Sequence, residues 1–172
     1  MEVIWFSQEF LPFPGHFGIL PTPGYYSHSS TAADLDSLTR QNVSRIMCLQ
    51  EAHEFERMEP PETIEERRRA VRRRDMFFTH SPIEDFCAPT LSQAQSLVSL
   101  LEHDLQQGHN VVAHCFAGLG RAGTLAACLL VSQGMTAQDA TALVRWYRPG
   151  AIQSYSQEQL IAIFAQQQSP SL

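Results

Sequence analysis

The residues best suited to covalent chemistry lie together in one short segment, residues 111–124. An apolar run ends in a His-Cys pair, a loop with two glycines follows, and Arg121 stands six positions after Cys115. A thiolate is a strong nucleophile. A guanidinium can bind two oxygens of one phosphate. The spacing therefore predicts a phosphate-binding loop that opens with a nucleophilic thiol and closes with an arginine.

The loop between Cys115 and Arg121 is expected to form a cradle for an anion. Its glycines let successive backbone N–H groups turn inward, and the helix that follows adds the positive end of its dipole. The same groups stabilise a thiolate, so we expect Cys115 to be ionised at neutral pH. The residues predicted to hold the phosphate are Phe116, Ala117, Gly118, Leu119 and Gly120, together with Arg121.

Three other interpretations of this loop fit its residues less well. Residues 118–123 match G-x-G-x-x-G, but a dinucleotide site usually lies on the first strand of its unit, with an acidic residue ~20 positions later. Here the first downstream acid is Asp139, in a helical pattern. A nucleotide P-loop would need a lysine, which residues 118–124 lack. A plain buried cysteine leaves the glycines, the arginine and the helix start unexplained.

Strands and helices alternate along the chain, which predicts a single α/β domain with a central, mostly parallel sheet and helices on both faces. The apolar run in residues 122–132 predicts a centrally buried helix. Strands are expected at 2–6, 17–20, 43–49, 76–80 and 110–114, and helices at 32–41, 63–73, 91–107, 122–132, 137–147 and 156–167. The cradle should then lie at the carboxyl edge of the strand that ends at His114.

Composition narrows the class of protein. The chain has 172 residues, 44% of them hydrophobic, and a net charge of −6, so a nucleic-acid footprint is not expected. No apolar run is long enough for a membrane span and the N-terminus lacks a signal-peptide pattern, so we expect a cytoplasmic protein. We expect one domain over residues 1–168, a flexible tail at 169–172, a monomer, and neither metal nor other cofactor.

The segment resembles the signature of the protein tyrosine phosphatase superfamily, a His-Cys pair, five residues and an arginine. Gly-Leu-Gly-Arg at 118–121, Ala-Ala-Cys-Leu-Leu at 126–130 and Gly-Ala-Ile-Gln at 150–153 resemble the small atypical dual-specificity phosphatases, in particular the kinase-associated phosphatase and its bacterial relatives. The resemblance extends over residues 17–164. It implies the α/β cysteine-phosphatase fold, no cofactor, and hydrolysis through phosphocysteine.

The resemblance also implies a general acid on a loop about thirty residues before the cysteine. Asp85, in the run 82–89, aligns with that acid, and Glu84 is the rival candidate. The same carboxylate would later activate water. His114 would bond to loop carbonyls and hold the shape of the cradle.

Ala122 departs from the family pattern, which has Ser or Thr there to stabilise the departing thiolate. We expect slower breakdown of the phosphoenzyme as a result. Thr124 lies nearly half a helical turn further round and is not expected to substitute fully. Gln153 and Gln157 follow a helix stop, and an amide there could position the hydrolytic water; capping by this segment, with a solvated glutamine, is the equal alternative.

Cys48 aligns roughly with a cysteine of the kinase-associated phosphatase, which implies a possible reversible disulfide with Cys115. The alternative is a buried core thiol. The arginine-dense run 65–74 pairs Glu65 with Arg69 at i,i+4 and is interpreted as a solvated helix face. A basic patch that recruits a polyanionic partner is the alternative.

The implied substrate is a phosphorylated protein, with phosphotyrosine and phosphoserine or phosphothreonine both admitted by a shallow cleft. Relatives that hydrolyse phosphoinositides or the 5′ phosphate of RNA leave non-protein substrates open. A binding module without turnover, in which Arg121 recognises phosphate while Ala122 marks lost catalysis, is a second hypothesis of a different class.

Overall fold

The computed structural model describes residues 1–26 and 28–168, and the expected tail at 169–172 lies outside these residues. Within the described ranges, a five-stranded sheet has the order β1-β2-β5-β3-β4. Only β1 runs antiparallel to its neighbour β2; β2, β5, β3 and β4 are mutually parallel. The predicted α/β fold with a mostly parallel sheet is confirmed.

Strands and helices follow one another closely along the chain. The strands are β1 (Ile4–Trp5), β2 (Phe17–Leu20), β3 (Val43–Cys48), β4 (Phe77–His80) and β5 (Asn110–His114). The helices are α1 (Thr31–Arg40), α2 (Ala52–Phe55), α3 (Ile64–Arg72), α4 (Leu91–Gln106), α5 (Gly120–Ser132), α6 (Ala137–Tyr147) and α7 (Tyr155–Gln168).

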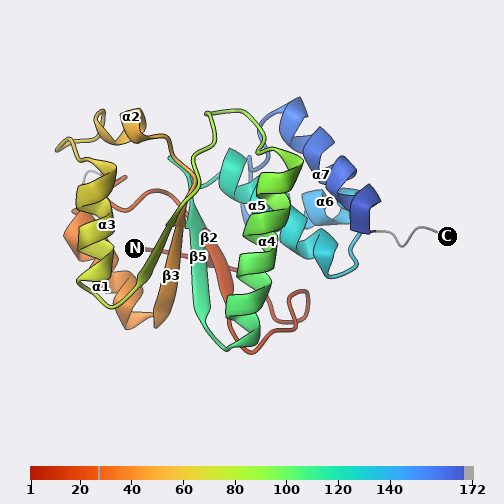
Figure 1. Cartoon of the computed structure of the whole chain (residues 1–172), viewed down its shortest axis with the longest axis horizontal. Coiled ribbons are helices and arrows are strands. Elements are labelled where there is room, and N and C mark those ends of the chain that lie inside the picture. The colour runs from red at the N-terminus through yellow and green to blue at the C-terminus, as the bar shows by residue number, and fades with distance from the viewer. Residues whose placement is uncertain (27, 169–172) are drawn as a thin grey trace.

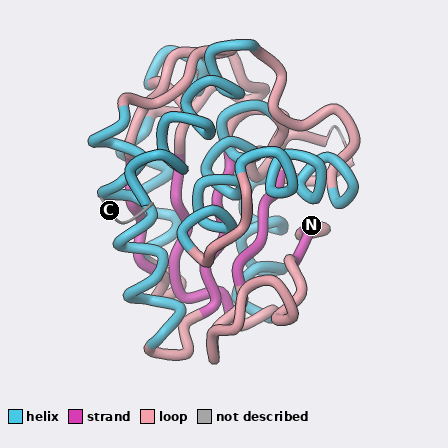
Figure 2. Tube along the Cα trace, turned by 90° about the vertical axis from the view of Figure 1, so that its right-hand side faces the viewer, coloured by secondary structure: helices cyan, strands magenta, loops and turns pink. Residues whose placement is uncertain are grey.

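Helices cover both faces of the sheet, α1 and α3 on one and α4, α5, α6 and α7 on the other (Figure 1). In the view turned by 90°, the strands lie side by side between helices (Figure 2). Two hydrophobic clusters follow from this arrangement because successive side chains of a strand point to opposite faces. Met47 and Leu49 enter the larger cluster with α4–α7, whereas Ile46 and Cys48 enter the smaller one with α1 and α3.

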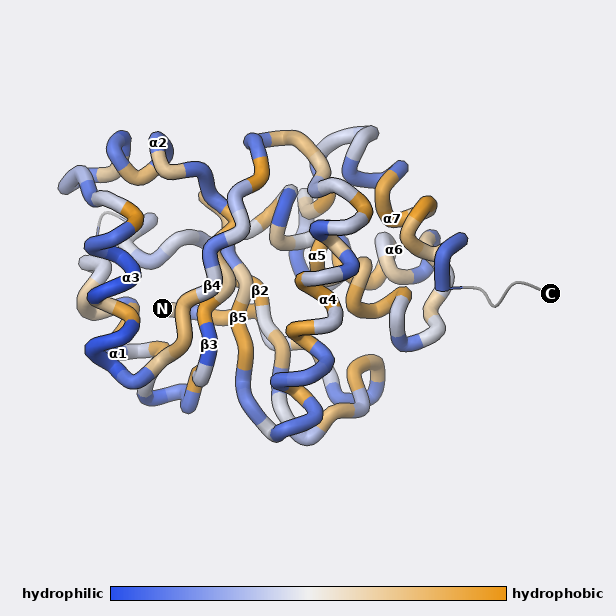
Figure 3. The backbone as a smooth tube through the Cα atoms, in the orientation of Figure 1, coloured by the Kyte–Doolittle hydropathy of each residue, from blue (hydrophilic) through white to orange (hydrophobic). Residues whose placement is uncertain are grey.

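Helix α5 is the central helix of the larger layer. Every residue from Gly120 to Val131 is buried, as expected for a helix that is apolar nearly all round (Figure 3). It packs against α4, α6 and α7 and against β2 and β5. The helix begins at Gly120, two residues before the predicted start, because the loop leads directly into it. This burial fixes the start of α5 relative to the carboxyl end of β5.

The structure differs from the sequence predictions at two places. The short helix α2 was not predicted, because its four residues carry no hydrophobic period. The arginine-dense run was interpreted as a solvated face, but Arg67 is fully buried. Its guanidinium pairs with Glu62 at 2.7 Å and donates to the carbonyl of Pro23 at 2.9 Å. Several other arginines of the run do lie on the surface, where Arg69 pairs with Glu65 as expected.

Candidate active site

The loop between β5 and α5 holds Cys115 at the carboxyl edge of the central strand. Gly118 adopts a φ of +68°, and a Cβ there would lie 2.4 Å from the backbone of Leu20, so only glycine fits. The loop is tied down from outside, because Thr22 donates its N–H to the Phe116 carbonyl at 2.9 Å. Among the described residues, the backbone N–H groups of residues 116–119 donate to no backbone carbonyl. These donors, with the N-terminus of α5, remain available for an anion.

Arg121 is held at the same place by acidic partners. Its side chain is only 1% exposed and binds both carboxylate oxygens of Glu54, at 2.6 and 2.9 Å. It also donates to the Ile83 carbonyl at 2.9 Å and lies 3.0 Å from Oδ1 of Asp85. Its Nε is buried and has no hydrogen-bond partner in the described part of the chain. The guanidinium is thus oriented by protein groups while one donor is left for a ligand.

The charge of Arg121 is secured by this environment. Burial disfavours the charged guanidinium, but the hydrogen bonds to Glu54 and the nearby Cys115 outweigh it, so the pKa of Arg121 lies above its ordinary value. Burial likewise would raise the pKa of Glu54, yet the bonds from Arg121 and from the Glu51 N–H hold it below its ordinary value. A fixed ion pair therefore lies beside the thiol.

Glu54 is a site residue that sequence reasoning missed. It lies in α2, 67 residues before Arg121 along the chain. The local signal is weak: Glu54 caps its own helix by accepting from the N–H of Glu51 at 2.8 Å. Nothing in that four-residue pattern indicates a partner so far along the sequence.

Asp85 lies across from Arg121 on the loop after β4, and its side chain is 55% exposed. The loop is anchored at both ends, because Ile83 donates to the Leu49 carbonyl at 3.1 Å and Gln157 donates to the Cys87 carbonyl at 3.1 Å. The rival Glu84 interacts instead with Cys87. Burial, followed by the Glu84 carboxylate, raises the pKa of Cys87. Of the two carboxylates, Asp85 is the one beside the cradle.

His114 is fully buried at the end of β5, with Nδ1 3.2 Å from the carbonyl of Cys115. A carbonyl can only accept, so Nδ1 carries the hydrogen. Burial, followed by the charge of Arg67, lowers the pKa of His114 to about 3. A neutral imidazole therefore lies under the first peptide of the loop.

The remaining residues singled out in the sequence surround the start of α5. Thr124 donates its hydroxyl to the Gly120 carbonyl at 2.8 Å, so its hydrogen is engaged within the helix. Gln153 and Gln157 lie against Gly120, where a Cβ would meet their amides at 2.8 and 2.9 Å. Ala122 is fully buried, next to Arg121.

Cys48 belongs to the cluster on the α1 and α3 side of the sheet, whereas Cys115 belongs to the cluster on the opposite side. Burial raises the pKa of Cys48 to about 12, so its thiol is protonated at neutral pH. All four cysteines are free.

Arg148, a second residue missed in the sequence, follows α6 and donates to the Ala117 carbonyl of the loop at 3.0 Å. Among the described residues, its buried Nε has no partner. Arg148 therefore stabilises the loop through a carbonyl oxygen and leaves the N–H groups of the loop unoccupied.

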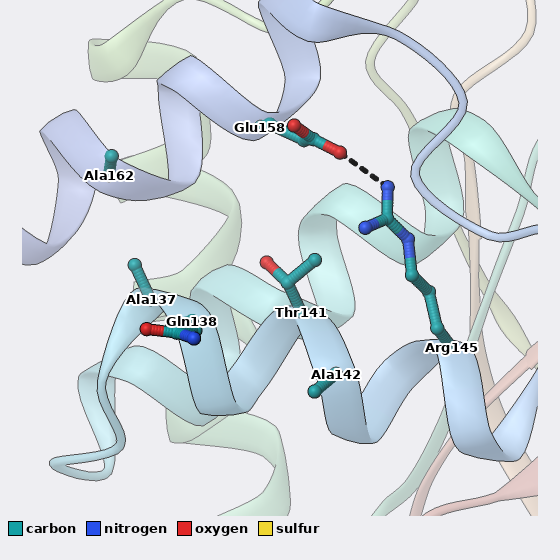
Figure 4. A pocket seen from close by; sticks show the side chains of 7 residues that line it. All are labelled: Ala137, Gln138, Thr141, Ala142, Arg145, Glu158 and Ala162. Atoms are coloured by element: carbon teal, nitrogen blue, oxygen red, sulfur yellow. Dashed lines mark hydrogen bonds and ion pairs between the residues drawn. The ribbon is translucent and has the colours of Figure 1, made fainter.

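A separate hollow of about 570 Å³ lies between α6 and α7 (Figure 4). No residue of the cradle lines it. Arg145, at one end, pairs with Glu158 and donates to the carbonyls of Ala151 and Ile152 at 3.1 and 2.9 Å. Arg145 therefore links α6 to the loop that precedes α7 and to α7 itself.

A thiol, a buried arginine and an exposed carboxylate lie together at the carboxyl edge of this sheet, and the comparisons identify the chain as a member of the protein tyrosine phosphatase superfamily, of the small atypical dual-specificity type. The family model "Tc-R-P: Polymorphic toxin system, DSP-PTPase phosphatase" matches residues 23–135, and the chain belongs to this family.

Individual proteins show the same similarity. "Protein tyrosine phosphatase domain-containing protein 1" of Mus musculus is 36% identical over 96 residues, which are 55% of this chain but 13% of that protein. The chain thus spans a small part of the curated relatives that it first matches. The structure of kinase associated phosphatase superposes with a TM-score of 0.87 at 21% identity, covering 100% of this chain and 98% of the other. Tk-PTP in the active form gives 0.71 at 26% identity, covering 88% and 90%.

Within residues 1–26 and 28–168, no cluster of three or more His, Cys, Asp or Glu residues is arranged to hold a metal ion. None of the described helices is both long and apolar enough to span a membrane.

Proposed function

We propose that the chain hydrolyses phosphomonoesters through a phosphocysteine. The Cys115 thiolate attacks phosphorus, the bond between phosphorus and the ester oxygen breaks, and Asp85 in its acid form protonates the leaving oxygen. Backbone N–H groups of the loop and Arg121 bind the three equatorial oxygens as charge shifts in the transition state.

In the second step, Asp85 is a carboxylate and takes a proton from water. The water oxygen attacks phosphorus, the bond between phosphorus and sulfur breaks, and the Cys115 thiolate leaves with its electron pair. Inorganic phosphate is the product and Asp85 has regained its proton. We propose that the amide of Gln153, which lies against Gly120, orients this water. Gln157 would hold Gln153 in place, because its amide accepts from the Gln153 N–H at 2.8 Å and donates to the Cys87 carbonyl at 3.1 Å.

The observation that carries this proposal is the set of unused donors around Cys115. The N–H groups of residues 116–119 and Nε of Arg121 lack protein acceptors among the described residues, although Nε is buried. A buried donor that lacks a hydrogen-bond acceptor costs about 1–3 kcal/mol. Such a cost is offset when a phosphate oxygen accepts these bonds, which favours a tetrahedral dianion as the ligand.

The substrates we propose are phosphotyrosine and phosphoserine or phosphothreonine of proteins. The family description joins dual-specificity and tyrosine phosphatases, which supports both classes. The exposed Asp85 indicates a shallow approach to the thiol, open to short as well as long phosphorylated side chains.

A phosphate-binding module without turnover is the second candidate, and Ala122 favours it. No hydroxyl stands directly after Arg121 to stabilise the departing thiolate. In that case Arg121 and the loop would recognise a phosphate group without hydrolysing its ester.

The test is hydrolysis of para-nitrophenyl phosphate in EDTA and reductant. We expect no activity above background for Cys115→Ser, and a loss of about a hundredfold or more for Asp85→Ala at an assay pH near neutrality. Glu84→Ala, the neighbouring carboxylate, is the matched control and should retain activity near wild type. The proposal is wrong if Cys115→Ser remains active. No activity of the wild type, with a phosphate analogue still bound, would support the binding module.

A further inference from the structure

A second hollow, of about 340 Å³, adjoins the phosphate cradle. One wall is the loop after β2, with Tyr25 and Tyr26, and another is the segment after α2, with Arg57 and Glu59. The ring of Phe116, a residue of the cradle itself, completes the lining. We refer to this hollow as the aromatic pocket. A ligand whose phosphate lies in the cradle therefore has the aromatic pocket as its immediate neighbour.

The three rings of the aromatic pocket are partly exposed. Tyr25, Tyr26 and Phe116 are 39–41% accessible. Tyr25 meets Phe116 edge to face with centroids 5.3 Å apart, and meets Tyr26 in the same way at 5.1 Å. One face of Tyr26 is stacked on His28, with centroids 5.4 Å apart. The edge-to-face contact between Tyr25 and Phe116 leaves ring surface on which another ring can pack favourably.

The wall that carries the two tyrosines is held by buried polar groups. Arg67 donates to the Pro23 carbonyl at 2.9 Å from the interior. Asp34, also buried, accepts from the Gly24 N–H at 2.8 Å and from the Ser29 hydroxyl at 2.6 Å. Anchors on both sides of the tyrosines reduce the ordering cost of binding, which is what a recognition site needs.

The charges of the aromatic pocket nearly cancel. Arg57 brings one positive charge and Glu59 one negative charge, and both side chains are exposed. A second phosphate would need cations that are not offset by a carboxylate, and a basic side chain would meet Arg57. A neutral aromatic ring can pack on the exposed rings and is repelled by neither Arg57 nor Glu59.

We propose that the aromatic pocket binds an aromatic side chain that lies close to the phosphorylated residue in a peptide substrate. This binding rests on the proposed protein phosphatase function, because that function makes a phosphorylated peptide the substrate. Phe116 would then serve two roles, its N–H at the phosphate and its ring at the neighbouring side chain. Tyr25 and Tyr26 determine specificity and take no part in the chemistry.

The experiment measures binding, so that it does not depend on turnover. Cys115→Ser protein is titrated with phosphotyrosine peptides of alanine background that carry one phenylalanine at each flanking position in turn. We expect one position to tighten binding by about tenfold over the all-alanine peptide, the amount expected for partly burying an aromatic side chain. In the Tyr25→Ala/Tyr26→Ala background this preference should fall to about onefold.

Tyr155→Ala is the matched control, because that tyrosine is 74% exposed on α7 and does not line the aromatic pocket. It should leave the preference as in the parent protein. Equal binding of all peptides, a preference that survives in the double variant, or a stronger gain from lysine or a second phosphate would each overturn the proposal. Hydrolysis of para-nitrophenyl phosphate is measured separately on wild type; its absence would refute the proposed function, while the binding ratio still decides whether the pocket selects aromatic rings.

Discussion

Replacement of Glu54 by glutamine tests how the buried guanidinium of Arg121 is held. The change removes one negative charge and keeps the size of the side chain. In the native protein both Glu54 oxygens accept from Arg121, at 2.6 and 2.9 Å, and Oε1 also accepts from the Glu51 N–H. A glutamine offers one oxygen, and its amide N–H₂ would face the guanidinium, donor against donor.

The expected loss in the free energy of unfolding depends on the hydrogen-bond partners that Arg121 keeps in the variant. Breaking a buried ion pair by removing one partner costs about 3–5 kcal/mol. Here the guanidinium still has the Ile83 carbonyl and Asp85 at 3.0 Å, but Asp85 is more than half exposed and its charge is screened. We therefore expect Glu54→Gln to lower the free energy of unfolding by about 2–3 kcal/mol, which corresponds to a drop in Tm of about 4–12 °C for a chain of this length.

Urea denaturation followed by circular dichroism measures this difference at pH 7. Glu56→Gln, an exposed carboxylate two residues away, is the control and should change stability by less than about 0.5 kcal/mol. The pKa of Glu54 is held below its ordinary value of 4.5, so the stability it contributes is complete above pH 4.5 and is lost as the pH falls through the lower folded value.

Two results would refute this reasoning. Equal stabilities of Glu54→Gln and Glu56→Gln at pH 7 would mean that the ion pair contributes nothing net. A difference between wild type and Glu54→Gln that stays constant well below pH 4.5 would mean that the charge of Glu54 is not its source.

Three further predictions concern the residues around the thiol. Ala122→Ser should accelerate breakdown of the phosphoenzyme severalfold by supplying a hydroxyl to the departing thiolate; a burst measurement that shows an unchanged or slower second phase would contradict this. Asp85→Asn should bind inorganic phosphate about two- to fivefold more tightly, since the carboxylate competes for Arg121 and an exposed pair is worth about 1 kcal/mol at most; weaker binding in calorimetry would count against it. His114, with its pKa lowered from 6.5 to about 3, stays neutral in the folded state while the unfolded state takes up a proton below pH 6.5. Wild type should therefore lose about 2 kcal/mol of stability from pH 7 to pH 5 through this group, and His114→Gln should show a correspondingly flatter pH dependence in urea titrations.

The loop that we propose to bind phosphate could be located from sequence because its parts are local. A strand, a glycine-bearing loop and a helix start follow one another directly, so the relative placement of Cys115 and Arg121 is set within seven consecutive residues. The glycine at 118 is a local signal for a tight turn, because the positive φ that it adopts favours glycine. The α/β class was predictable for a similar reason, since alternating strands and helices favour a parallel sheet.

The partners of this cradle were decided by the tertiary structure alone. Glu54 and Arg148 reach the loop from α2 and from the end of α6, and neither belongs to a local pattern that indicates such a contact. Arg67 shows the same limit: its run of arginines is typical of a solvated face, yet packing against the loop after β2 buries it with Glu62. Sequence determined which residues can do chemistry, because backbone geometry acts over short distances along the chain. Only the packing of the sheet and helices determined which charged groups pair with these residues. Ion-pair and hydrogen-bond partners are selected by proximity in space and not along the chain.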